Sequence, residues 1–237
     1  MESTHAALTL FKSDRIGLMA QELRDPAASV IDNLEQVLEG VEPLTARQRL
    51  LISGARERAR HMRDVVDDVQ DAARFVHGDN KPHVSLHDLR TAVRDAIERN
   101  ASAAAHKSIA LTSELPGTAL QLRADRRMVV QLFNNLISNA IKFSEAGSTV
   151  RAGARRTATG VEGWVSDEGA GMHPFDLPHL FQKFPRPASR VLDSARSTGL
   201  GLYIVGEILR LHHGTIRVMT EPGKGSTFVF ELPRRAR

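Results

Sequence analysis

The chain has 237 residues, a length that fits one large domain or two modest ones, and we expect two. Its 41% hydrophobic and 25% charged residues exclude disorder or a fibrous structure for the chain as a whole. A net charge of +4 and an aromatic content of 5% argue against nucleic-acid binding. The absence of cysteine excludes disulfides and thiolate metal sites and favours a cytoplasmic location. No apolar stretch approaches the ~20 residues that span a bilayer, although a membrane anchor or sensor domain in a longer parent protein is compatible with the sequence.

The N-terminal part predicts two helices. Apolar residues recur with 4-3 spacing from Ile16 to Val41, and a break follows at residues 40–43. Thr45 and Gln48 form a capping box that begins a second helix, which extends to Val76. The apolar face of this second helix is wider than a two-helix hairpin can cover. We therefore expect a dimeric four-helix bundle, a homodimer; the alternative is packing onto the rest of the same chain.

A polar stretch at residues 77–82 marks the boundary between two domains, a helical hairpin over residues 1–78 and a mixed domain over residues 84–237. The second domain mixes helices and strands without regular alternation, which indicates an α+β sandwich with a mixed sheet under one helical layer. The expected helices are Ser85–Arg99, Arg126–Phe143 and Leu200–Leu211, and the expected strands are Ile109–Thr112, Ala119–Arg123, Val150–Arg155, Gly163–Ser166, Ile216–Thr220 and Thr227–Leu232.

The helix at Arg126–Phe143 carries a polar face that suits a metal-bound triphosphate. Asn135, Asn139 and Lys142 follow at i, i+4 and i+7, so they lie on one side. Amide oxygens ligate hard cations such as Mg²⁺, and an ammonium group pairs with phosphate. A solvated polar face is the alternative for this helix considered alone.

Three glycine-containing segments follow in the chain. Asp167, Gly169 and Gly171 form a D-x-G-x-G after an apolar strand, where the carboxylate could accept an adenine amino hydrogen and the glycines allow close backbone approach. Residues 197–202 open a helix whose free amides suit phosphate. Residues 223–228 lack the spacing of a phosphate loop and predict a tight turn into the last strand. An ordinary turn and a ligand-free helix entry are the alternatives for the first two segments.

In this order, the segments resemble the ATPase domain shared by sensor histidine kinases, DNA gyrase, mismatch-repair proteins and certain chaperones. The resemblance extends over about residues 84–233. Asn135–Phe143 is similar to the asparagine box, Asp167–Gly171 to the first glycine box, Leu180–Phe184 to the phenylalanine box, and Thr198–Leu202 to the second glycine box.

This resemblance implies the cofactors ATP and Mg²⁺. Asn139 would bind Mg²⁺, Lys142 phosphate and Asp167 adenine, and the stretch between Asp176 and Ser197 would be a mobile lid. The nucleotide site implied by the resemblance comprises Asn135, Lys142, Phe143, Asp167, Gly169, Gly171, Phe184, Thr198, Gly199, Leu200, Gly201, Leu202 and Thr227. Ser197 stands where many members have another glycine.

The phenylalanine box and the predicted hairpin narrow the resemblance to sensor histidine kinases, whose dimerisation domain is such a hairpin. Met19–Pro26 is similar to the phosphoacceptor box of that family, but Gln21 replaces its histidine. An amide nitrogen has no free lone pair to accept a phosphoryl group, and Glu22 then has no imidazole to orient. Asp25 stands where members with phosphatase activity carry Thr or Asn. We do not expect His61 to replace the acceptor, because Met62 and not an acidic residue follows it, and we interpret the pair His212–His213 as structural.

Three functions remain open. The first is the transmitter core of a two-component sensor histidine kinase that cannot phosphorylate itself and that signals to a response regulator or another protein. The second is a non-catalytic module whose dimer changes shape with nucleotide occupancy. The third is a kinase acting on Ser or His of a separate protein.

Overall fold

The computed structural model describes residue 23 and residues 27–39, 44–76, 81–182 and 199–234. The chain divides into two compact units, Met1–Asn80 and Lys81–Arg237. The second unit contains both helices and strands, as the α+β prediction requires.

The described residues of the first unit form two helices. Residues 27–39 are helical, and α2 spans Ala46–Val76. The predicted capping box at the start of α2 is confirmed: the Thr45 N–H donates to Gln48 Oε1 at 2.9 Å, and the Gln48 N–H donates to Thr45 Oγ1 at 3.2 Å. The two side chains therefore satisfy amides that have no partner within the helix.

Large apolar side chains of the first unit are exposed in the single chain. Leu50 is 74% exposed, Leu51 is 64% exposed and Met62 is 52% exposed, all on α2. Val30 and Val37 on the preceding helix are exposed as well. Part of the apolar face that the sequence predicts for this unit thus lies in solvent in the single chain.

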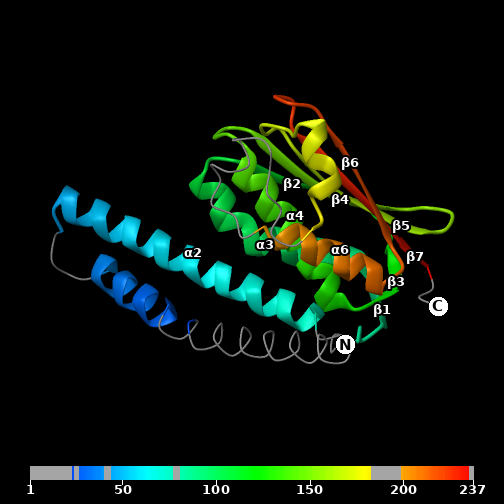
Figure 1. Ribbon diagram of the computed structural model, residues 1–237, viewed down its shortest axis with the longest axis horizontal. Coiled ribbons are helices and arrows are strands. Elements are labelled where there is room, and N and C mark those ends of the chain that lie inside the picture. The colour runs from blue at the N-terminus through cyan, green and yellow to red at the C-terminus, as the bar shows by residue number, and fades with distance from the viewer. Residues whose placement is uncertain (1–22, 24–26, 40–43, 77–80, 183–198, 235–237) are drawn as a thin grey trace, which may run out of the picture. The chain divides into compact units, whose positions relative to one another are not determined.

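The second unit is built on a five-stranded sheet (Figure 1). Its strand order is β2-β4-β5-β7-β6, and β2 runs parallel to β4 while the other neighbours are antiparallel, so the predicted mixed sheet is confirmed. The strands are β2 (Ala110–Glu114), β4 (Thr149–Arg156), β5 (Gly160–Asp167), β6 (Thr215–Thr220) and β7 (Ser226–Pro233). A separate antiparallel pair joins β1 (Ser85–Asp88) to β3 (Gln121–Ala124).

Helices α3 (Leu89–His106), α4 (Arg126–Phe143) and α6 (Gly201–Leu211) lie on one side of this sheet (Figure 1). α4 contacts both α3 and α6, and it also contacts β4 and β5. Between the layers, the rings of Phe133 on α4 and Phe230 on β7 pack edge to face with centroids 5.1 Å apart. A short 3₁₀ helix, η1 (Pro174–His179), follows β5.

The first predicted helix of this unit is wrong at its beginning. The sequence predicts a helix from Ser85, but residues 85–88 form strand β1 and α3 begins at Leu89. Asp88 is the N-cap, because its side chain accepts a hydrogen bond from the Arg90 N–H. The helix also extends beyond Arg99 to His106. The predicted bounds of α4 match the observed ones at both ends.

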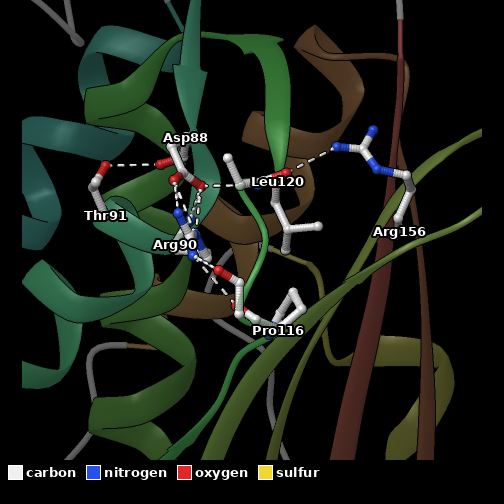
Figure 2. A network of polar contacts seen from close by, with 8 residues as sticks. Asp88, Arg90, Thr91, Pro116, Leu120 and Arg156 are labelled. Atoms are coloured by element: carbon white, nitrogen blue, oxygen red, sulfur yellow. Dashed lines mark hydrogen bonds and ion pairs between the residues drawn. The ribbon is translucent and has the colours of Figure 1, made fainter.

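Asp88 and Arg90 form the centre of the polar network in Figure 2. Asp88 Oδ1 accepts the Leu120 N–H at 3.0 Å, and the Arg90 guanidinium donates to Asp88 Oδ2 at 2.6 Å. Arg90 also donates to the Gly117 carbonyl at 2.8 Å. The network ties the start of α3 to the loop that leads into β3 (Figure 2).

Candidate functional site

The asparagine-containing helix α4 is positioned from both its ends. At its N-terminus, Asp125 Oδ1 accepts hydrogen bonds from the amides of Arg127 and Met128. At its C-terminus, the Phe143 carbonyl accepts the Ala170 N–H at 3.3 Å, so the helix end contacts the D-x-G-x-G segment. The helix thus has a fixed relation to one of the predicted glycine segments.

The predicted polar face of α4 lies against the start of α6. Asn135 is buried, and its Nδ2 donates to the Gly201 carbonyl at 3.3 Å. A Cβ added at Gly201 would lie 3.8 Å from Asn139 Nδ2 and 3.9 Å from Asn135 Cγ. Further along, the Lys142 ammonium lies 5.8 Å from the centroid of the Phe143 ring. Asn135 and Asn139 therefore approach the second glycine segment, and Lys142 precedes Phe143, whose carbonyl accepts the Ala170 N–H of the first.

Asp167 ends strand β5 with one carboxylate oxygen fully engaged. Its Oδ1 accepts the Gly169 N–H at 2.9 Å and the Ser226 N–H at 3.1 Å. Its Oδ2 accepts no hydrogen bond from the residues that the structure describes. Burial raises the pKa of the carboxyl above its usual value, and the two backbone donors oppose that shift. The arrangement leaves a half-buried acceptor in a fixed orientation.

The two glycines of this segment are required by close contacts. A Cβ at Gly169 would lie 2.5 Å from the Phe143 carbonyl oxygen. Gly171 has φ +62°, and a Cβ there would lie 2.0 Å from the Glu221 carbonyl oxygen. The turn between β6 and β7 holds the segment from the other side, because the Gly223 N–H donates to the Ala170 carbonyl at 2.7 Å. The prediction of a tight turn at residues 223–228 is confirmed by the positions of β6 and β7.

Among the described residues, no side chain caps the start of α6. Gly199 has φ +68°, and Leu200, the N-cap residue, makes no side-chain capping bond. Leu200 is 1% exposed, whereas Leu202 is partly exposed. On the opposite side of the helix, a Cβ at Gly206 would lie 3.6 Å from Phe181 Cβ. The phenylalanine segment thus packs against α6.

Comparison with known proteins identifies the domain that carries this site. Residues 124–236 match the family described as histidine kinase-, DNA gyrase B-, and HSP90-like ATPase. The sensor-like histidine kinase SenX3 of Mycobacterium tuberculosis is 30% identical over 232 residues, which are 98% of this chain and 56% of SenX3. The chain carries a histidine kinase ATPase domain. Such domains bind ATP, usually with Mg²⁺.

The relatives extend beyond the ATPase domain. The circadian input-output histidine kinase CikA of Synechococcus elongatus is 30% identical over 94% of this chain and 30% of its own length. The chain therefore spans about half, or less, of the curated relatives it matches. The crystal structure of full-length ShkA in complex with AMPPNP superposes with a TM-score of 0.70 at 27% identity, over 94% of this chain and 47% of ShkA. The Acinetobacter baumannii histidine kinase AdeS shares the fold at 22% identity and a TM-score of 0.61, over 90% of this chain and 98% of that one.

Thr227, one of the residues predicted for the nucleotide site, lies apart from the others. The Thr227 hydroxyl pairs with the Ser166 hydroxyl at 2.8 Å, and both residues alternate with Asp167 and Ser226 along their strands. Thr227 therefore faces the side of the sheet away from Asp167. The residue opposite Asp167 is Ser226, whose amide donates to the carboxylate, and sequence reasoning missed it. Only the register of β5 against β7 identifies it.

Four predicted residues lie outside the described residues: Gln21, Glu22, Phe184 and Thr198. Most of the stretch predicted as a lid also lies outside the described residues.

His212, interpreted as structural, is buried, and both its ring nitrogens have backbone partners. In the part of the chain that the structure describes, no helix is long and apolar enough to cross a bilayer. No group of three or more His, Asp or Glu residues could hold a metal ion there.

Proposed function

We propose that the ATPase domain binds one ATP with Mg²⁺ along the polar face of α4. The observation that carries this proposal is that α4 hydrogen-bonds both glycine segments, through Asn135 to Gly201 and through Phe143 to Ala170. Residues far apart in the sequence thereby contribute one acceptor, two amides, one ammonium group and the N-terminal turn of α6 to a single side of one helix. That set matches the chemistry of an adenine nucleotide with a bound cation.

Asp167 binds the adenine base in this proposal. With Oδ1 held by two backbone amides, Oδ2 is the oxygen that accepts a hydrogen bond from the exocyclic amino group of adenine. A base with a carbonyl in that position would direct an acceptor against an acceptor. The site therefore prefers adenine to guanine nucleotides.

Asn139, Lys142 and the start of α6 bind the cation and the phosphates. Asn139 offers one amide oxygen to Mg²⁺, and the remaining ligands come from phosphate oxygens and water, because the described residues offer no carboxylate cluster. Lys142 pairs with phosphate as a point charge. The start of α6 supplies backbone amides to the same phosphates.

Calorimetric titration of the full chain with ATP in the presence of Mg²⁺ tests this proposal. We expect Asp167→Asn to weaken ATP binding by more than about tenfold, because the adenine amino group would meet an amide donor. Glu168→Gln is the matched control, since the bonds of this exposed neighbour among the described residues are to Thr149 and Arg151. No heat of binding in the wild type, or equal binding by both variants, would refute the proposal.

We further propose that the chain is the cytoplasmic transmitter core of a two-component sensor histidine kinase. Histidine kinases generally dimerise and signal to response regulators. The exposed Leu50, Leu51 and Met62 on α2 support a dimeric four-helix bundle, because pairing two copies would remove these side chains from water. Gln21 replaces the acceptor, so this chain does not phosphorylate itself.

Uptake of label from γ-labelled ATP by the chain and by its Gln21→His variant tests the second proposal. Acid-labile, alkali-stable label on the variant alone indicates a working ATP site whose acceptor is missing. Label on neither chain, with intact ATP binding, favours the non-catalytic module that responds to nucleotide occupancy. Label on both chains would contradict our interpretation of Gln21 and direct attention to His61. Transfer to an added protein by the unmodified chain would instead indicate a kinase acting in trans.

A further inference from the structure

All four carbonyl groups at the C-terminal end of α4 have identified partners. The Ala140 carbonyl accepts the Ser144 N–H at 3.1 Å, and the Phe143 carbonyl accepts the Ala170 N–H. The Ile141 and Lys142 carbonyls accept hydrogen bonds from a side chain of another helix, the Lys107 ammonium, at 2.9 and 2.7 Å. Without that ammonium group, these two carbonyls would need water or would lose their partners.

Lys107 is itself held rigidly at the end of α3. It is the C-cap of that helix, and its N–H bonds to the carbonyls of Ala103 and Ala104. The next residue, Ser108, has φ +56°, and its carbonyl accepts the Gly147 N–H at 2.9 Å. The backbone therefore fixes the base of the Lys107 side chain beside the end of α4.

The charge of Lys107 acts where an anionic ligand is expected. The C-terminus of a helix carries a partial negative charge, which repels phosphate. Lys142 lies in the last turn of α4, and Asn139 lies in the turn before it. An ammonium group on the Ile141 and Lys142 carbonyls offsets this negative charge and fixes the backbone that bears Lys142.

We propose that Lys107 is a positioning residue of the nucleotide site, which supports binding of the phosphate groups through the last turn of α4 without touching the nucleotide. This inference rests on the proposed ATP binding. It predicts an effect that grows with the number of phosphates on the ligand. A residue that merely stabilised the fold would affect all adenine ligands equally.

Titrations of ATP, ADP and adenosine into the wild type and Lys107→Met test the inference. Methionine retains the apolar stem and the helix-compatible backbone but removes the charge and the donors. We expect ATP binding to weaken about three- to tenfold, ADP binding to weaken less, and adenosine binding to remain within about twofold of the wild type. Lys107→Arg should restore most of the ATP affinity, since its guanidinium can still donate to the carbonyls.

Lys81→Met is the matched control, because it removes one positive charge from the exposed start of the same unit. Unchanged ATP affinity in Lys107→Met, or equal losses for ATP and adenosine, would overturn the inference while leaving the proposed ATP binding intact. If the wild type binds none of the three ligands, the proposed function fails and the inference fails with it. The two failures are therefore distinguishable in one set of titrations.

Discussion

The imidazole of His212 accepts a hydrogen bond from the backbone N–H of Asp125 at 3.0 Å. Its other nitrogen, Nδ1, lies 2.8 Å from the Ile208 carbonyl oxygen. Because an amide can only donate and a carbonyl can only accept, Nε2 is the acceptor and Nδ1 is the donor in these two contacts. The contact joins the end of α6 to the start of α4, while Asn135 and Gly201 join the middle of α4 to the start of α6. The two helices of the site thus run antiparallel and are tied at two points.

We expect His212→Ala to lower the free energy of unfolding by about 1–3 kcal/mol, because it leaves the buried Asp125 N–H without an acceptor. Urea denaturation followed by circular dichroism measures the change. His106→Ala, at the exposed end of α3, is the control and should shift the free energy by less than about 0.5 kcal/mol. Equal effects of the two substitutions would mean that the His212 contact contributes nothing.

The raised pKa of Asp167 predicts that its charged carboxylate lowers the free energy of unfolding at neutral pH. A carboxyl whose folded-state pKa lies above the unfolded value of 3.8 stabilises the folded protein most below that pH. This stabilisation is lost as pH rises through the folded pKa. Asp167→Asn keeps an oxygen for the Gly169 and Ser226 amides and removes the charge. We therefore expect the variant to be more stable than the wild type at pH 7 and equally stable below about pH 3.8.

Free energies of unfolding measured from pH 3 to pH 7 would show this difference, and Glu168 provides a contrast of opposite sign. The Thr149 N–H holds the pKa of Glu168 below its usual value, so its contribution is present above 4.5 and lost as pH falls. Glu168→Gln should therefore be less stable than the wild type at pH 7. A wild type that is more stable than Asp167→Asn at pH 7 would contradict the assignment.

The sequence predicted α4 at both ends but not the beginning of α3, and local chemistry explains both outcomes. Asp125 caps α4 directly before an apolar run, so the helix signal is unambiguous. At α3, Ser85 and Asp88 have the spacing of a capping box, yet Asp88 is the true N-cap. Residues 85–88 become a strand only because β3, more than thirty residues later, pairs with them. Such a distant partner leaves no local signal.

The site shows the same limit at a finer scale. The sequence predicted the D-x-G-x-G segment because its glycines reflect close backbone contacts. Thr227 was implied by the family resemblance, and the sequence alone does not separate it from Ser226, because both are hydroxyl residues at the start of a strand. A shift of one residue along a strand moves the side chain to the opposite face of the sheet. Only the pairing of Asp167 with Ser226 shows which hydroxyl residue shares a face with Asp167.

Two helix ends place non-glycine residues in the left-handed region. Ser108 follows α3 with φ +56°, and His213 follows α6 with φ +53°. Each lies in a Schellman motif: the next residue, Ile109 or Gly214, donates back to the helix at 2.8 Å. Glycine is the residue usually found at this position.

Ser108→Gly and His213→Gly should each raise the free energy of unfolding by about 0.5–1 kcal/mol, because the steric cost of a Cβ at positive φ is removed. Gly147→Ala is a control of opposite sign: its φ is +85° and nothing lies within 4 Å of an added Cβ, so backbone strain alone should lower stability. Chemical denaturation measures all three. Destabilisation by both glycine substitutions would show that the side chains outweigh the strain.

The ion pair of Asp88 and Arg90 predicts a loss of stability in acid. The hydrogen bonds from Arg90 lower the pKa of Asp88 from 3.8 to about 2. The contribution of the carboxylate is therefore fully present above 3.8 and is lost as pH falls toward about 2. Asp88→Asn retains an acceptor for the Arg90 N–H but loses the charge. We expect the variant to be about 1–2 kcal/mol less stable than the wild type at pH 7, with the gap narrowing toward pH 2.5.

Asp95→Asn is the control, because it removes a simple surface ion pair. Asp95 accepts from Arg126 with both side chains partly exposed, so its loss should change the free energy of unfolding by less than about 0.5 kcal/mol. Urea unfolding of both variants from pH 7 to pH 2.5 makes the comparison. A gap for Asp88→Asn that stays constant over this range would show that hydrogen-bond geometry, rather than the charge, ties α3 to the loop before β3.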